Sequence, residues 1–409
     1  MSHLMSQSIK IYSQLANHKL FNKKINFGLE RIKLALKKLG DPEKKLSNTI
    51  QIVGSDGKFT LLSCLKFFIE ANKQTVATHV SPSLQDIKER FWMGTRYLTH
   101  SEIKKTIKQI EKLKIPLTVF EVLTLIFIIN AAKKNNDFII MEAGCGWRLD
   151  SNNVIDFPLI QSIVNINKQH LRLLKVKSLN EVINEKVGFL SNFTNIYIGK
   201  QKPFVMQKIK TLLKKNISKI KYPNTWQLLK VKKTYFYKDK KTKIKLDTKY
   251  VRSKGLLENL CLAIKIALDL KIDSHVIKKT IPKIKLPGRI DYLNNGKLIK
   301  KINKNEKLLI DGCHSETSAK NLANYLKSTK IPVYGIWGMI KNKNPDKFIK
   351  EFKGIFKKII TIPIENETAS LSNKLLFKIA KNNNYITEFS KSFEEALKKI
   401  SSKEKKIIC

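Results

Sequence analysis

Short apolar runs alternate with longer segments of helical periodicity along the first part of this chain. The runs at 49–53, 75–80, 138–141 and 162–166 have the composition of buried strands. Apolar residues at helical spacing predict helices at 20–40, 58–71, 101–113 and 118–133, the first containing Ile25, Leu29, Ile32 and Leu36. This alternation favours an α/β fold with a parallel sheet, whose binding site lies at the carboxyl ends of the strands.

The second part of the chain contains a different pattern followed by another α/β series. Residues 229–250 alternate apolar and polar positions, which predicts a β-hairpin, and a helix is expected at 256–270. Prolines at 282 and 287 bound a predicted hinge. Strands at 307–310, 333–337 and 358–362 then alternate with helices at 316–326 and 345–352. Since 409 residues exceed one ordinary core, we expect two domains, at 1–284 and 285–409.

The net charge of +46 first suggests a nucleic-acid partner, but its composition argues against one. Of the 79 basic residues, 72 are lysine and seven are arginine, and the lysines are spread along the chain. Base and bidentate phosphate recognition favour arginine, so nucleic acid is not expected as a partner. A retained arginine is informative in such a chain, because it suggests a site that needs a planar, forked donor. Four of them lie in the motifs below: Arg31, Arg90, Arg148 and Arg289.

No segment predicts a membrane span or a secretory signal. The longest apolar stretch, 119–132, is interrupted by Glu121, Thr124 and Asn130, and the N-terminus lacks an apolar signal core. The five cysteines are scattered, without metal-binding spacing or a disulfide framework. We therefore expect a cytoplasmic protein.

The segment GSDGKFT at 54–60 is a candidate phosphate-binding loop. It lies between a predicted strand and a predicted helix, where backbone N–H groups, a lysine and a hydroxyl can surround phosphates. Ile52 occupies the position of the first glycine in the common motif, so a glycine-containing turn is the alternative.

Further candidate residues follow other predicted strands. MEAGCGWRLDSNNVID at 141–156 places Glu142 at a strand end, and NINKQH at 165–170 places His170 beyond another. EVINEKVGF puts Lys186 on a helix, LPGRID carries Arg289, and LLIDGCHSE carries Asp311 and His314. Each has a structural alternative: a packed His170, a helix-capping Glu142 or Asp150, a surface Lys186, a core Phe59 or Trp147, and a small apolar Cys313.

The order of these segments resembles the folylpolyglutamate synthase and dihydrofolate synthase branch of the Mur ligase superfamily. The family's short loop GTNGKGS is similar to residues 54–60, its EVGLGGRLDATNVID to 142–156, and its NIGxDH to 165–170. Its EKAG, PGR and DGAHN are similar to 185–188, 287–289 and 311–315. INFGLERI at 25–32, VSPSLQDIKERF at 80–91 and TVFEVLT at 118–124 also resemble family segments, so the resemblance covers about residues 18–370.

The resemblance implies a Mur-ligase-like P-loop ATPase domain with a parallel sheet, followed by a smaller Rossmann-like α/β domain for glutamate ligation. It implies an ATP-dependent ligase that adds L-glutamate to dihydropteroate or tetrahydrofolate through an acyl phosphate. The implied cofactors are ATP and Mg²⁺, with K⁺ as a further cation. The implied partners are small-molecule substrates, and we expect a monomer without a membrane partner.

The resemblance also assigns roles to individual residues. It implies catalytic roles for Lys58, Lys186 and His314, with Lys186 at the position of the family's carbamylated lysine. The ATP-binding candidates are Gly54, Gly57, Lys58, Phe59, Thr60, Asn259, Arg289 and Asp311. The metal candidates are Thr60, Ser81, Glu142 and His170, and the pterin candidates are Phe27, Gly28, Phe120, Glu121 and Asp150.

Several positions depart from the family pattern. Phe59 and Trp147 replace glycines, Gln169 replaces the aspartate before His170, and Ser83 and Ser315 replace a histidine and an asparagine. Gly255-Leu256 stands for a His-Gln pair, and Asn342-Lys343-Asn344 for Asp-Lys-Asp. Two alternatives to a working folate ligase therefore remain. One is a paralogue with reduced chemistry that binds nucleotide or RNA, and the other is a Mur-type ligase for another acid.

Overall fold

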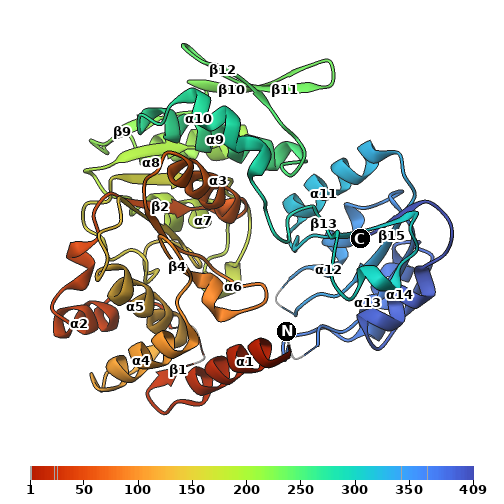
Figure 1. Ribbon diagram of the computed structural model, residues 1–409, viewed down its shortest axis with the longest axis horizontal. Coiled ribbons are helices and arrows are strands. Elements are labelled where there is room, and N and C mark those ends of the chain that lie inside the picture. Colours follow the sequence, from red (N-terminus) through yellow and green to blue (C-terminus); the bar gives the residue numbers. More distant parts are fainter. Residues whose placement is uncertain (1, 23, 25, 342, 366) are drawn as a thin grey trace. The chain divides into compact units, whose positions relative to one another are not determined.

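The computed structural model describes residues 2–22, 24, 26–341, 343–365 and 367–409. Its contacts divide the chain into two compact units (Figure 1). Unit 1 comprises residues 1–247 and 258–284, and unit 2 comprises residues 248–257 and 285–409. The division of ATP binding and glutamate ligation between the two expected domains stays a prediction.

A seven-stranded sheet forms the centre of unit 1, in the order β4-β3-β6-β2-β7-β8-β9. All neighbouring strands in it are parallel except β3 and β4. The predicted parallel α/β fold is therefore confirmed. The strands are β2 (Thr49–Val53), β3 (Val76–His79), β4 (Phe91–Met93), β6 (Phe138–Glu142), β7 (Ile160–Ile163), β8 (Asn195–Ile198) and β9 (Lys219–Lys221).

Helices cover both faces of this sheet. Ala77, Ile139 and Met141 pack with α1 (Ser2–Asn17), α2 (Glu30–Lys38), α4 (His100–Glu111) and α5 (Val119–Ala131). Val53 and Ile163, on the same face, pack with α7 (Leu179–Val187) and α8 (Pro203–Leu212). On the other face, α3 (Lys58–Ala71) packs against β2, β3 and β6, and α10 (Ser274–Thr280) packs against α3 (Figure 1). The predicted helices at 58–71, 101–113, 118–133 and 256–270 correspond to α3, α4, α5 and α9 (Lys254–Asp269).

Residues 20–40 do not form the single helix that their periodicity predicted. Phe21–Asn22 forms β1, which pairs in parallel with β5 (Leu117–Thr118), and α2 begins only at Glu30. The backbone before α2 is held in a loop because Arg31 Nη2 donates to the carbonyl oxygen of Asn26 at 2.6 Å. Ile25, part of the predicted helix, lies outside the described residues.

The predicted hairpin at 229–250 is part of a three-stranded antiparallel sheet. Its strands are β10 (Trp226–Val231), β11 (Thr234–Asp239) and β12 (Lys243–Leu246). The second turn was missed because a side chain forms it. Asp239 Oδ1 accepts hydrogen bonds from the backbone N–H groups of Lys241 and Thr242, at 2.9 and 2.7 Å.

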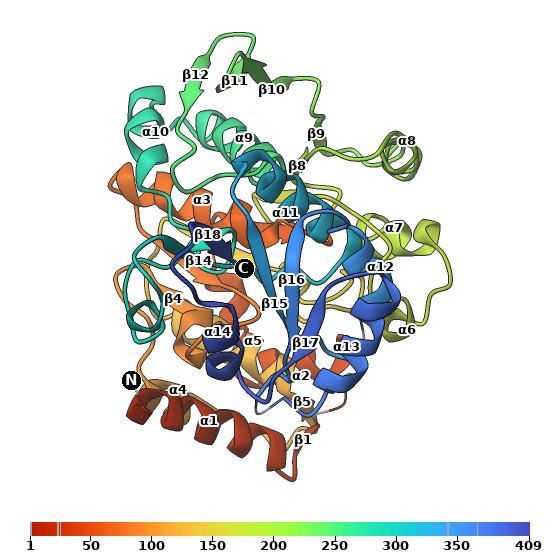
Figure 2. The same ribbon diagram turned by 90° about the vertical axis from the view of Figure 1, so that its right-hand side faces the viewer.

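Unit 2 is the smaller α/β domain that the sequence predicted. Its six-stranded sheet has the order β13-β14-β18-β15-β16-β17 and is parallel except for β13. The strands are β13 (Asp291–Tyr292), β14 (Glu306–Ile310), β15 (Val333–Trp337), β16 (Phe356–Thr361), β17 (Thr387–Phe389) and β18 (Lys406–Ile408). The helices are α11 (Glu316–Thr329), α12 (Pro345–Lys350), α13 (Asn373–Asn382) and α14 (Phe393–Ile400). Figure 2 shows β15, β16 and β17 side by side.

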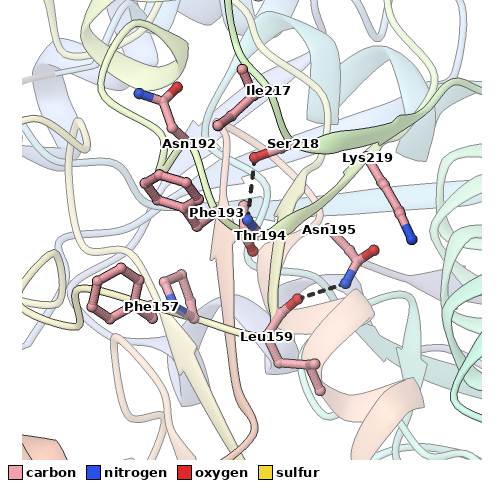
Figure 3. Close-up of a pocket in the computed structure, with 10 residues that line it drawn as sticks. Phe157, Leu159, Asn192, Phe193, Thr194, Asn195, Ile217, Ser218 and Lys219 are labelled. Atoms are coloured by element: carbon pink, nitrogen blue, oxygen red, sulfur yellow. Dashed lines mark hydrogen bonds between the residues drawn. The ribbon is translucent and has the colours of Figure 1, made fainter.

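The two ends of the parallel strands in unit 1 differ in character. The glycine loop follows the carboxyl end of β2. A pocket of about 440 Å³ lies at the amino ends of the strands, where the segments leading into β7, β8 and β9 meet (Figure 3). Phe157 and Phe193 line this pocket and are largely exposed, and none of the candidate site residues lines it. Among the described helices, none is long and apolar enough to cross a membrane.

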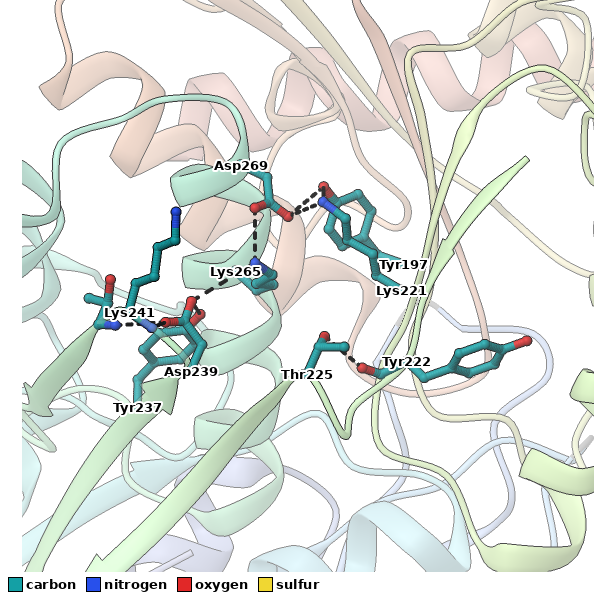
Figure 4. Close-up of polar contacts among 10 residues, drawn as sticks. Tyr197, Lys221, Tyr222, Thr225, Tyr237, Asp239, Lys241, Lys265 and Asp269 are labelled. Atoms are coloured by element: carbon teal, nitrogen blue, oxygen red, sulfur yellow. Dashed lines mark hydrogen bonds and ion pairs between the residues drawn. The ribbon is translucent and has the colours of Figure 1, made fainter. Parts of the chain in front are cut away.

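A polar network ties the last strands of the sheet to α9 and the three-stranded sheet (Figure 4). The Tyr197 hydroxyl and Lys221 Nζ donate to Asp269 Oδ2 at 2.8 and 2.6 Å, and Lys265 Nζ donates to Asp269 Oδ1 at 2.9 Å. Lys265 also lies 3.9 Å from Asp239, which accepts from the hydroxyl of Tyr237. Burial alone would raise the pKa of Asp269, but these three donors lower it below its ordinary value.

This network predicts a difference between two tyrosine variants in unit 1. Tyr197→Phe removes a buried hydrogen bond to a carboxylate, so it should lower the free energy of unfolding by about 1–2 kcal/mol. Tyr222→Phe is the matched control, because no described residue hydrogen-bonds that hydroxyl, and its effect should stay within about 0.5 kcal/mol. Urea unfolding followed by circular dichroism measures both. Equal effects of the two substitutions would contradict the role given to Tyr197.

Candidate active site

Four adjacent strands of unit 1 bring most of the candidate residues together at the carboxyl ends of these strands. Ile52 of β2 pairs with Glu142 of β6, and Val53 pairs with Ile163 of β7. β3 is parallel to β6, so residues 80–82 follow at the same end. The glycine loop, Ser81, Glu142 and the segment 164–170 therefore leave the sheet next to one another.

The loop backbone adopts a conformation that requires its two glycines. Gly54 has φ +147° and Gly57 has φ +101°, both in the range that side-chain-bearing residues rarely adopt. A Cβ atom on Gly57 would also lie 2.5 Å from Asn259 Nδ2, and one on Gly54 would collide with Val164. The structure thus places the predicted Asn259 of α9 directly against the loop. The loop lies between strand β2 and helix α3, as the prediction of a phosphate-binding loop requires.

Two lysine ammonium groups meet at the carbonyl oxygen of Gly54. Lys58, the first residue of α3, reaches back so that its Nζ donates to Gly54 O and Ser55 O, each at 3.2 Å. Lys186 of α7 donates to the same Gly54 O at 3.0 Å and is only 2% exposed. The alternative of a surface Lys186 is therefore wrong.

Ser81 and Glu142 are in direct contact at this end of the strands. Glu142 is 4% exposed, and its Oε2 accepts from the backbone N–H of Ser81 at 3.3 Å. Arg90 fixes the serine side chain, because its Nη1 donates to Ser81 Oγ at 3.0 Å. Arg90 Nε donates in turn to the hydroxyl of Tyr12, so the unpredicted helix α1 supports this part of the site.

The two other metal candidates, Thr60 and His170, lie on neighbouring segments. Thr60 is buried in the first turn of α3. His170 is half-buried, has φ +59° and directly precedes α6 (Leu171–Leu174). Among the described residues, no group of three or more histidine, cysteine, aspartate or glutamate side chains is arranged to hold a metal ion.

Asp150 stabilises the Gly144–Gly146 turn. Its Oδ2 accepts from the backbone N–H groups of Gly144 and Cys145, at 2.8 and 2.9 Å, and its Oδ1 accepts from Asn152 N. Burial raises the pKa of Asp150, whereas these hydrogen bonds oppose the shift. Its carboxylate therefore bonds mainly the preceding turn rather than capping a following helix, and its pterin role stays a prediction.

The other pterin candidates gather around the start of α5. The Phe120 ring lies so close to Gly144 that a Cβ atom there would collide with it. Glu121 is 3% exposed and pairs with Arg31, at 3.2 Å to Nη2. Arg31 also contacts the loop that carries Phe27 and Gly28, since it binds Asn26 O. The retained Arg31 thus joins two candidate segments.

The two glycine replacements cause no backbone strain. Phe59 lies in α3, and neither Phe59 nor Trp147 has a positive φ. Trp147 is fully buried in the apolar cluster with Val182, Ile183 and Ile163. The alternative that Trp147 is a core residue is therefore confirmed. Phe59 is half-buried in the first turn of α3.

Arg289, Asp311 and His314 lie together in unit 2. Gly312 N donates to Gly288 O at 2.9 Å, which joins the two turns that carry these residues. Asp311 accepts from Ile290 N and Cys313 N, both at 2.8 Å, and burial raises its pKa although Arg289 opposes the shift. Ser315 caps α11 by accepting from Ser318 N. Asn342, the first residue of the Asn342-Lys343-Asn344 segment that departs from the family pattern, lies outside the described residues.

Asp56 is a further polar residue of the glycine loop, to which no sequence motif pointed. Its carboxylate accepts from Asn167 Nδ2 at 2.5 Å and from Gln169 Nε2 at 3.1 Å. The adjacent Ser55 N donates to Asn165 O at 2.7 Å, and Asn167 N donates to Ser55 Oγ at 3.1 Å. The sequence signal that could have identified Asp56 is an acidic side chain within a predicted phosphate-binding loop.

The chain is similar to named enzymes over nearly its whole length. It is 25% identical over 390 residues to the dihydrofolate synthase/folylpolyglutamate synthase of Buchnera aphidicola (Schizaphis graminum), covering 94% of this chain and 90% of that one. It is 24% identical over 374 residues to the Bacillus subtilis protein of the same name, covering 85% and 84%. No family model matches the chain.

Solved structures share the fold. A Mycobacterium tuberculosis folylpolyglutamate synthase complexed with ADP and AMPPCP superposes with a TM-score of 0.84 at 17% identity, covering 99% of this chain and 95% of that one. Escherichia coli FolC in complex with DHPP and ADP gives 0.84 at 20% identity, covering 98% and 93%. The chain is thus similar along nearly its full length to proteins named dihydrofolate synthase/folylpolyglutamate synthase, and it shares the fold of solved structures of such enzymes.

Proposed function

We propose that this protein is an ATP-dependent ligase that joins L-glutamate to dihydropteroate, to tetrahydrofolate or to both. The observation that carries the proposal is the loop at 54–58, where two obligatory glycines and Lys58 stand at the start of α3. Relatives that cover nearly the same length bear the names dihydrofolate synthase and folylpolyglutamate synthase. The proposal therefore combines the geometry of the loop with the similarity of the chain to these relatives.

The loop supplies the groups that phosphoryl transfer needs. Free N–H groups at the start of the 14-residue helix α3 favour an anion there, and the two lysines add positive charge. Lys58 Nζ donates to the loop carbonyl oxygens of Gly54 and Ser55. We propose that phosphate oxygens replace these carbonyls as its acceptors, so that Lys58 stabilises the transferring group.

The oxygen-rich residues beside the loop fit a hard divalent cation. Glu142 provides a buried carboxylate, and Thr60 and Ser81 provide hydroxyls. We propose that these residues, with His170 directly or through water, hold Mg²⁺, and that K⁺ is a further cation. When bound, the ion would neutralise charge on the phosphate oxygens.

The reaction has two chemical steps. A carboxylate oxygen of the pterin substrate attacks the γ-phosphorus of ATP, and the bond to ADP breaks to leave an acyl phosphate. The neutral amine of L-glutamate then attacks the acyl carbon, phosphate leaves, and the amine proton is lost. We propose that Phe27, Gly28, Phe120, Glu121 and Asp150 bind the pterin, that Arg289 and Asp311 contact the nucleotide, and that His314 contacts the glutamate and the acyl phosphate.

Lys186 has the properties required for carbamylation. Its burial and the nearby Lys58 lower the pKa of the amine to about 8, so the neutral fraction near neutral pH is far larger than for an ordinary lysine. A neutral amine adds to CO₂ and releases one proton, which forms a carbamate. The product keeps an N–H for Gly54 O and replaces repulsion from Lys58 by attraction. We propose that Lys186 is modified in this way. We further infer that the protein is a cytoplasmic monomer. We also infer that it has no nucleic-acid partner, and the scarcity of arginine supports this last inference.

Phosphate release tests the proposed reaction. Purified protein with Mg-ATP and L-glutamate should release phosphate only when dihydropteroate or tetrahydrofolate is added, each offered separately. Lys58→Ala should lower the rate by at least about a hundredfold, because it removes a charge that stabilises the transferring phosphoryl group. Lys105→Ala, on the exposed side of α4, should leave the rate unchanged.

The alternatives give different outcomes in the same assay. No release with either pterin, from folded protein that still binds ATP, would contradict the folate ligase. Release that needs a UDP-linked acid instead would indicate another Mur-type ligase. Tight, salt-sensitive RNA binding without turnover would indicate the non-catalytic paralogue.

The pKa of Lys186 predicts how its carbamate depends on pH. In ¹³C-bicarbonate, the wild-type protein should show a carbamate carbon by NMR that grows as the pH rises from 6.5 through about 8, because the amine loses its proton in that range. Lys186→Met should lack this signal, whereas Lys105→Ala should retain it. A wild-type spectrum identical to that of Lys186→Met would show that Lys186 is not carbamylated.

A further inference from the structure

A carboxylate–amide contact connects the phosphate loop to the segment that ends at His170. Asp56 lies between the two loop glycines, and its carboxylate accepts from the side-chain amides of Asn167 and Gln169. Asp56 also pairs with Asn165 in an isolated antiparallel bridge. The loop is therefore fastened to residues 165–169 by backbone and side-chain bonds together.

The two ends of this contact are exchanged relative to the family motifs. The loop GTNGKGS has asparagine where this chain has Asp56, and NIGxDH has aspartate where this chain has Gln169. One position has gained a carboxylate and the other has lost one, so the pair keeps one negative charge. In this chain the two changed side chains are hydrogen-bonded to each other at 3.1 and 3.2 Å. Each departure considered alone suggests damage, whereas the pair preserves a donor–acceptor contact.

We propose that Asp56 and Gln169 are positioning residues that replace each other's chemical roles, and that their contact holds the phosphate loop in its nucleotide-binding conformation. The inference rests on the proposed function only in assuming that residues 54–58 bind ATP phosphates. Gln169 directly precedes His170, whose φ is +59°. The same contact thus fixes the start of the histidine segment as well as the loop.

The electrostatics make the pair interdependent. In Asp56→Asn, amide groups face one another where a carboxylate now accepts two hydrogen bonds. In Gln169→Asp, a second carboxylate is placed near the first, and like charges repel at this separation. The double variant Asp56→Asn/Gln169→Asp restores one carboxylate and one amide, with the roles exchanged. A purely local packing role would not predict recovery in the double variant.

A four-protein cycle tests this proposal: wild type, Asp56→Asn, Gln169→Asp and the double variant. Each single variant should raise the Kd for Mg-ADP and the KM for ATP by at least about tenfold, because each removes a hydrogen bond to a charged group. The double variant should return to within about threefold of wild type, which is smaller than the loss from one such bond. Gln85→Asp, an exposed substitution of the same chemistry, is the matched control and should leave both constants unchanged.

The readouts separate positioning from folding and from the ligase reaction. The thermal midpoint without nucleotide shows whether each variant is folded, and Mg-ADP binding by calorimetry does not require turnover. Losses that multiply in the double variant, or single variants that bind Mg-ADP as wild type does, would overturn the proposal. Recovered binding without activity on any folate would uphold the contact and contradict the ligase, whereas an active ligase without coupling in the cycle would do the reverse.

Discussion

The left-handed backbone of the glycine loop is the constraint on which the candidate active site depends. Gly54 and Gly57 have φ values of +147° and +101°, and both are enclosed by neighbouring side chains. This backbone turns the carbonyl oxygen of Gly54 toward Lys58 and Lys186, and the helix α3 starts directly after it. The parallel sheet supplies the remaining residues, since Glu142 ends one of the two strands that flank β2 and the 164–170 segment follows the other. The strands of the unit 1 sheet and helix α3 thus position the glycine loop.

Charge balance explains why a strongly basic chain keeps buried acids near this loop. Burial disfavours the charge of Lys186, and the neighbouring Lys58 repels it, and together these effects lower the pKa of Lys186. Asp56 and Asp150 oppose that shift, so they retain positive charge where phosphates would bind. The total charge of +46 is therefore a poor guide to function, whereas the few buried charges are informative.

The sequence predicted the fold well where a single local pattern determined an element. The apolar run at 49–53 and the capped helix at 118–133 are examples, since Thr118 and Glu121 form a capping box. The helix predicted at 20–40 failed because a distant strand, Leu117–Thr118, pairs with Phe21–Asn22. β18 was missed because Ile407 and Ile408 form a very short strand that is central only after long-range pairing. In the site, motifs located Lys58, Glu142 and Lys186, but the Asp56–Gln169 contact joins residues 113 positions apart, which no single motif contains.

The most direct test of this account is the effect of a Cβ atom on Gly57. The Kd of Mg-ATP would be measured by calorimetry for Gly57→Ala and for the matched variant Gly296→Ala. Gly296 has nearly the same φ, +103°, but no atom lies within 4 Å of its added Cβ. The account predicts that Gly57→Ala weakens binding by at least about fivefold, since the strain is of order 1–3 kcal/mol, and that Gly296→Ala leaves binding unchanged. Wild-type affinity in folded Gly57→Ala would contradict the claim that residues 54–58 bind the phosphates.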